Sequence, residues 1–194
     1  MDLIDEEVRN CLKCRLSKTR KNAVPGEGNI DSRVVFIGEA PGYWEDAKGR
    51  PFVGAAGKLL DEMLLKAGFL RNEVYITNVV KCRPPGNRDP RPDEIEPCTP
   101  YLDRQIDSIK PKFIVTLGRH SASCILSKMG YEISGITRAR GRIYEAELWG
   151  CNIRVIPTFH PAAALYDVKL KDYLEKDFQL LKKELERGIG PESL

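Results

Sequence analysis

Four of the six cysteines stand at spacings that suit metal ligation. Cys11 and Cys14 form a Cys-x2-Cys pair, whereas Cys82 and Cys98 bracket a loop with four prolines between Arg83 and Pro92. Intracellular chains rarely hold such a set as disulfides, so we expect four thiolates at one metal centre that ties the N-terminus to this loop. On spacing alone, a structural zinc ion is favoured at least as much as a [4Fe-4S] cluster.

Three polar residues stand within or at the ends of apolar runs, where a ligand site can form. His160 closes an apolar strand and precedes a proline, which keeps its backbone extended. Asn78 lies inside VYITNVV, where an asparagine is unfavourable unless its amide is satisfied. Glu39 follows the run RVVFIG within GEAPG. Alternatively, His160 caps a helix or lies in the core, and Asn78 bonds a neighbouring loop.

The elements that position these residues alternate between strands and helices. Short apolar runs predict strands at 33–38, 74–80 and 112–118, and a hairpin over 142–161. Helical spacing predicts helices at 54–68, 93–108 (interrupted or started late by Pro97 and Pro100), 120–128 and 168–187. This order predicts an α/β fold with a mostly parallel sheet, whose ligand site lies beyond the carboxyl ends of the strands.

Length and charge narrow the class of protein. The 194 residues, 42% hydrophobic, predict one domain over 1–194, of which only the terminal GIGPESL is expected to fray. A net charge of +3 means that any nucleic-acid surface is local. The acidic N-terminus and the absence of a long apolar run predict a cytoplasmic protein without a membrane segment. The 30% charged content fits a thermophilic source or ordinary solvated helix faces.

Six motifs together carry a resemblance to a known family. From CLKC through GEAPG, GRPFVG, TNVVKCRPPGNR and Cys98 to TFHP, the chain resembles the iron–sulfur, family 4 uracil-DNA glycosylases of archaea and thermophiles. The resemblance covers nearly the whole chain and implies a three-layer αβα sandwich around a mostly parallel four-stranded sheet. It also implies a [4Fe-4S] cluster in place of zinc. The implied activity is monofunctional: the enzyme flips uracil out of DNA, hydrolyses its N-glycosidic bond and leaves an abasic site, which initiates base excision repair.

The resemblance also implies roles for individual residues. His160 donates to uracil O2, where negative charge develops as the glycosidic bond breaks. Asn78 pairs with uracil N3–H and O4, which have the opposite polarity in cytosine. Phe52 stacks on the flipped base, with simple core packing as the alternative. Glu39 positions or activates the attacking water.

Three further positions belong to the implied substrate site. Glu45 fills the space against the thymine methyl group, although a solvated acidic pair with Asp46 is the alternative reading. Gly38 and Ala40 flank Glu39, and Ala40 stands where the better-known uracil glycosylases carry an aspartate.

Local clusters of polar and basic residues suit contacts with DNA. Arg83, Asn87 and Arg88 lie in the proline-rich loop, and Arg140 lies in a second arginine-rich loop; all four are expected near phosphates. Leu165 is the expected wedge that enters the duplex after base flipping, with Ala164 or Tyr166 as substitutes. The alternative is that the arginines are unpaired on a solvated rim.

Two other functions compete with this hypothesis. A non-catalytic nucleic-acid-binding module, held by a structural metal on the same cysteines, would explain the thiols and arginines but leave Glu39, Asn78 and His160 without a shared purpose. A sister glycosylase with a broader choice of bases would use the same pocket. We expect a monomer that binds uracil-containing DNA, single- or double-stranded.

Overall fold

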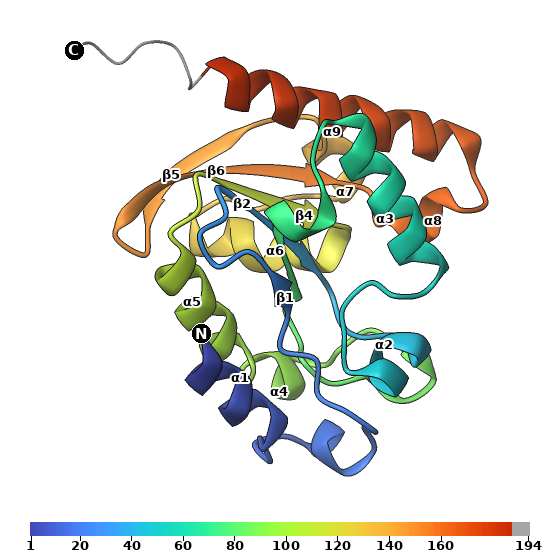
Figure 1. Cartoon of the computed structure of the whole chain (residues 1–194), viewed down its shortest axis with the longest axis vertical. Coiled ribbons are helices and arrows are strands. Elements are labelled where there is room, and N and C mark those ends of the chain that lie inside the picture. Colours follow the sequence, from blue (N-terminus) through green and yellow to red (C-terminus); the bar gives the residue numbers. More distant parts are fainter. Residues whose placement is uncertain (188–194) are drawn as a thin grey trace.

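A six-stranded mixed sheet forms the centre of the computed structural model, which describes residues 1–187 (Figure 1). GIGPESL, expected to fray, lies outside the described residues. The strand order is β1-β3-β2-β4-β6-β5. The strands are β1 (Glu27–Gly28), β2 (Val34–Gly38), β3 (Tyr75–Asn78), β4 (Phe113–Leu117), β5 (Tyr144–Leu148) and β6 (Cys151–Thr158). The inner four strands are parallel, and β1 and β5 add antiparallel edges. The predicted α/β fold is confirmed. The sheet has six strands where the resemblance implied four, and one of the two edge strands, β5, is the first arm of the predicted hairpin.

Helices cover both faces of the sheet and so bury its inner strands on both sides. Every residue of β2 and β4 is buried, and alternate residues of β2 enter two separate hydrophobic clusters. One cluster includes residues of α1 (Asp2–Arg9), α5 (Thr99–Ile109) and α6 (Arg119–Lys128). The other includes residues of α3 (Ala55–Lys66), α8 (Pro161–Ala164) and α9 (Val168–Arg187) (Figure 1). These layers form the expected αβα sandwich.

Short helices and turns fill the connections. They are α2 (Tyr43–Lys48), α4 (Pro92–Ile95), α7 (Ile136–Ala139) and the 3₁₀ turns η1 (Arg15–Lys18), η2 (Arg71–Glu73) and η3 (Pro85–Asn87). The helix expected over 93–108 is divided into α4 and α5, because Pro97 cannot continue α4. None of the helices in residues 1–187 combines the length and apolar character that crossing a membrane requires.

Side-chain bonds hold the proline-rich loop, where prolines prevent backbone ladders. The Arg88 guanidinium donates to both carboxylate oxygens of Glu94, at 2.8 and 2.6 Å. Glu94 is buried, and its bonds to Arg88 lower its pKa to about 2. This paired carboxylate anchors the loop onto α4.

A buried ion pair joins the loop after α7 to α9. The Arg140 guanidinium bonds both oxygens of buried Asp177, which also accepts from Thr158 Oγ1 at 2.6 Å. Burial raises the pKa of Asp177, and the bonds from Arg140 oppose that rise. Arg140, expected at DNA phosphates, therefore has its guanidinium engaged in an internal contact between elements far apart in sequence.

Replacing Arg140 with methionine should destabilise the fold strongly. Removing one partner of a buried ion pair leaves an uncompensated charge, which costs about 3–5 kcal/mol in the free energy of unfolding. Urea denaturation measures this loss. The control is Arg138→Met, because Arg138 is exposed and should change stability by about 0.5 kcal/mol or less. Equal stability of the two variants would contradict a structural role for Arg140.

Candidate functional site

A cavity of about 330 Å³ opens beyond the carboxyl ends of the parallel strands. Four separate segments contribute its walls: the loop after β2, the turn before α3, the proline-rich loop and the segment after β6. Their lining residues include Glu39, Ala40, Gly42, Glu45, Phe52, Asn87, Arg88, Asp89 and His160. A volume of this size suits a small molecule or a single base. Most of the predicted site residues are thus brought together.

The pairing of β2 with β3 brings the first two loops to this edge. Gly38 lies opposite Asn78 in the parallel register, and the backbone N–H of Val79 donates to the Gly38 carbonyl at 3.0 Å. A Cβ atom on Gly38 would lie 2.3 Å from Asn78 Oδ1 and 2.7 Å from the Phe52 ring. Only glycine therefore allows Asn78 and Phe52 to approach each other here.

Asn78 does not itself line the cavity, but it offers an unused acceptor close to the Phe52 ring. Its side chain is 2% exposed, and Oδ1 has no hydrogen-bond partner among the described residues. An unpaired buried carbonyl oxygen is costly, so its retention points to a ligand that supplies the missing donor.

Phe52 is held in an unusual conformation against His160. Its backbone φ is +50°, which a non-glycine residue rarely adopts, and its ring stacks on the imidazole with centroids 5.7 Å apart. Glu45 secures the turn, because its Oε1 accepts from the backbone N–H groups of Val53 at 2.8 Å and Gly54 at 3.0 Å. Two flat rings therefore form one wall of the cavity. Glu45 is held by two backbone hydrogen bonds, so it is not the solvated residue that the alternative interpretation predicted.

His160 presents a neutral hydrogen-bond donor to the cavity. It is the N-cap of α8, and its Nδ1 accepts from the backbone N–H of Ala162 at 3.1 Å. Burial lowers the pKa of His160 to about 4, against a smaller opposing effect of Glu45. A neutral imidazole that accepts at Nδ1 carries its proton on Nε2. His160 therefore caps a helix, as the alternative interpretation predicted, and this contact sets the tautomer of its imidazole.

Glu39 lies in a polar cluster that the sequence did not reveal. His120 Nε2 lies 3.9 Å from the Glu39 carboxylate and 2.8 Å from that of Asp89, and Arg119 Nη2 lies 3.4 Å from Asp89. Burial raises the pKa of Glu39, whereas His120 and Arg119 lower it and Asp89 raises it. The only available signal was that His120 opens α6 just after β4, on the same edge of the sheet.

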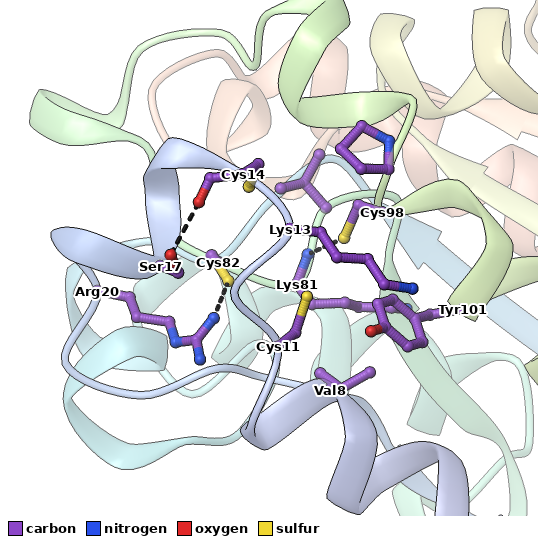
Figure 2. A pocket seen from close by; sticks show the side chains of 12 residues that line it. Val8, Cys11, Lys13, Cys14, Ser17, Arg20, Lys81, Cys82, Cys98 and Tyr101 are labelled. Carbon is purple, nitrogen blue, oxygen red and sulfur yellow. Dashed lines mark hydrogen bonds between the residues drawn. The ribbon is translucent and has the colours of Figure 1, made fainter.

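The four predicted cysteines surround a second, small cavity beside the first. Cys11 and Cys14 approach from the N-terminal segment, and Cys82 and Cys98 from the two ends of the proline-rich loop, so that the sulfur atoms surround a common space (Figure 2). Among the described residues, no three of these sulfur atoms lie within 4.8 Å of one another. A tetrahedral zinc ion, with bonds of 2.3 Å, would draw its ligands to about 3.8 Å apart.

Cationic groups and backbone donors face these sulfur atoms. Arg20 Nη1 donates to Cys82 Sγ at 3.0 Å, and the backbone N–H of Lys81 donates to Cys98 Sγ at 3.2 Å (Figure 2). Burial raises the pKa of Cys82, and that of Cys98 to about 11, so these thiols need a positive partner to ionise. This donor set fits a thiolate-bound iron centre larger than one ion, with hydrogen bonds to its sulfur ligands.

Lys81 connects the cysteine cavity to the strand that carries Asn78. Its buried Nζ donates to Thr77 Oγ1 at 2.6 Å, the Asn78 carbonyl at 2.8 Å and Gln105 Oε1 at 2.6 Å. Burial lowers the pKa of Lys81 to about 8. The sequence did not indicate this network, because Gln105 reaches Lys81 from α5, 24 residues further along the chain.

The residues predicted to contact DNA have different surroundings. Arg83 Nε donates to Asn87 Oδ1 at 2.7 Å on the loop beside the cavity, and Arg88 is bonded to Glu94. Leu165 and Tyr166 are exposed at the end of α8, whereas Ala164 is buried and cannot enter DNA as a wedge.

Comparisons with known proteins place this geometry in a family. Residues 25–182 match the family model of the uracil DNA glycosylase superfamily. The chain is 54% identical over 186 residues to the type-4 uracil-DNA glycosylase of Saccharolobus solfataricus, covering 95% of this chain and 86% of that protein. It is 57% identical over 192 residues to the enzyme of that name from Sulfurisphaera tokodaii, covering 98% and 86%. For Archaeoglobus fulgidus the identity is 52% over 179 residues, covering 92% and 90%.

The chain therefore belongs to the uracil DNA glycosylase superfamily and, within it, to the type-4 uracil-DNA glycosylases. This confirms the resemblance that the sequence motifs indicated.

Proposed function

We propose that this protein, as a single-domain monomer, hydrolyses the N-glycosidic bond of uracil flipped out of DNA into this cavity. The observation that carries the proposal is the buried, unpaired Oδ1 of Asn78 near the Phe52 ring, which stacks on His160. Family membership supports it. The product is an abasic site, which begins base excision repair.

Asn78 and Phe52 recognise the base. The Asn78 carboxamide accepts from uracil N3–H through Oδ1 and donates to O4, whereas cytosine presents the opposite polarity and leaves both groups unpaired. Phe52 stacks on the ring, a contact of about 1–3 kcal/mol. The missing side chain at Gly38 lets Asn78 and Phe52 approach each other, and the small side chain of Ala40 leaves room for the base.

His160 stabilises the departing uracil. As the C1'–N1 bond breaks, negative charge collects on O2, and the Nε2–H group of His160 donates to it. Burial keeps the imidazole neutral, since its pKa is about 4, so Nδ1 accepts from Ala162 while Nε2–H donates to the base. The donor is most effective where water is excluded.

Glu39 holds the water that attacks C1'. Its carboxylate accepts a proton from that water as the oxocarbenium-like sugar is captured. Asp89 and His120 orient the carboxylate within their cluster. Glu45 holds the turn before α3 and closes the space that a thymine methyl group would need.

DNA contacts surround the mouth of the cavity. Arg83, Asn87 and Arg88 lie on its proline-rich side and bind phosphates, while Leu165 fills the gap left by the flipped base. Arg88 and Arg140 each bond an internal carboxylate, Glu94 and Asp177 respectively, and keep further N–H groups with which they contact phosphates.

Cys11, Cys14, Cys82 and Cys98 hold a [4Fe-4S] cluster. The support is the common cavity, the wide spacing of the sulfur atoms and the N–H donors that face them. When bound, the cluster crosslinks the N-terminal segment to the proline-rich loop, and we assign it no step in the hydrolysis.

Replacing His160 with alanine should lower the single-turnover rate of uracil excision by about 10²-fold or more, because one transition-state donor is lost. The assay is a uracil-bearing oligonucleotide followed by alkali, with a thymine oligonucleotide as control. If the wild-type protein binds the oligonucleotide but leaves no alkali-labile site, it is a non-catalytic module. An unchanged rate in the variant would refute only the role of His160.

Glu39 gives the reaction a predictable acid limb. A water-activating carboxylate must be ionised, so activity falls as pH drops through the pKa of Glu39, which lies above its ordinary 4.5. The positive charge of protonated His120 lowers that pKa. The His120→Gln variant should therefore lose activity at a higher pH than the wild type. An acid limb that stays in place, measured as single-turnover rate against pH, would exclude this coupling.

The purified protein should contain iron and sulfide and absorb visible light. Cys98→Ser should lose most of this absorption and part of the stability, whereas Cys124→Ser, which lies outside the four-cysteine cavity, should keep both. Metal analysis and visible spectra provide the measurement. Stoichiometric zinc in a colourless protein would identify the centre as structural zinc instead.

A further inference from the structure

Two adjacent aromatic side chains at the edge of the cavity have no role in the function described above. Tyr43 and Trp44 open α2 and remain 56% and 55% exposed. Their rings meet edge to face, with centroids 5.1 Å apart. Large aromatic side chains lose favourable burial when they stay in water, so an exposed pair beside a ligand site indicates a binding surface.

The pair is continuous with the walls of the cavity. It lies in the chain between Gly42 and Glu45, both of which line the cavity. Trp44 Cδ1 lies 3.4 Å from the position that a Cβ atom on Gly54 would take. The backbone N–H of Gly54 donates a hydrogen bond to Glu45. A ligand that extends out of the cavity on this side would therefore meet these rings.

A cation completes the surface. The Arg83 guanidinium lies 5.1 Å from the centroid of the Tyr43 ring, and its Nε is bonded to Asn87 at the rim of the cavity. Exposed aromatic faces beside an arginine are the components of sites that bind single-stranded nucleic acid, where bases stack and phosphates meet the cation. This chemistry matches a polyanion that carries flat bases.

We propose that Tyr43 and Trp44 form a stacking subsite for the unpaired base next to the flipped uracil on the same strand. Arg83 contacts the phosphate between these two nucleotides. The inference rests on the proposed function, and it adds a preference for single-stranded or locally unpaired DNA, because only an unstacked neighbour can reach the rings.

The test pairs protein variants with matched substrates. Wild type and Trp44→Ala are compared by kcat/KM on a single-stranded uracil oligonucleotide with thymine on both sides, and on oligonucleotides with a tetrahydrofuran abasic site on the 5' or 3' side of the uracil. We expect Trp44→Ala to lower kcat/KM about tenfold on the intact strand, and by less than twofold when the stacked neighbour is missing.

Control variants separate stacking from damage to the fold. Trp44→Phe keeps a flat ring and should recover most of the activity. Tyr131→Ala removes an exposed ring from another edge-to-face pair, with Tyr144, that does not line the cavity, and should behave as wild type. A Trp44→Ala loss that is the same on every substrate would overturn the proposal, as would no loss at all.

A binding measurement keeps this proposal separate from the proposed function. Fluorescence anisotropy with a labelled, uracil-free oligothymidine should show weaker binding by Trp44→Ala and Tyr43→Ala than by the wild type, whether or not uracil is excised. Absence of excision by the wild type would refute the glycosylase function. Normal excision together with unchanged oligothymidine binding by both variants would refute the stacking subsite alone.

Discussion

The parallel pairing of β2 with β3, and the missing side chain at Gly38 within it, is the constraint on which the site depends. The register places Gly38 beside Asn78. Beyond the strands, the backbone N–H of Val79 donates to the Gly38 carbonyl, and that of Val80 donates to the Glu39 carbonyl. These bonds carry the two loops to one edge of the sheet. A methyl group at Gly38 would occupy the space where Asn78 Oδ1 and the Phe52 ring approach each other.

Burial acts in opposite directions on the two ionisable groups of the proposed mechanism. For His160, exclusion of water disfavours the cation, lowers the pKa to about 4 and leaves a neutral donor. For Glu39, it disfavours the anion and raises the pKa, while His120 supplies a compensating charge. Burial thus prepares a neutral hydrogen-bond donor at His160 and, together with the charge of His120, a proton acceptor at Glu39.

The proline-rich loop links the cavity to the cysteine centre. Its residues Asn87 to Asp89 line the cavity, and the cysteines at its two ends face the other side. Because prolines deny this loop a regular backbone ladder, it depends on the Arg88–Glu94 ion pair and, in our proposal, on the cluster. Lys81 adds a further link, since its main chain bonds Cys98 and its ammonium group bonds the Asn78 carbonyl.

The sequence by itself determined the alternation of strands and helices, the four clustered cysteines and the placement of Glu39 and His160 at one edge, because these follow from local periodicity and motif spacing. Only the tertiary structure decided which charges meet. The sequence indicated Arg140 only as a phosphate ligand, whereas the fold also pairs it with Asp177 of α9, 37 residues away, and no spacing rule joined His120 to Glu39. Such pairs depend on how elements pack, which the order of residues along one element does not express.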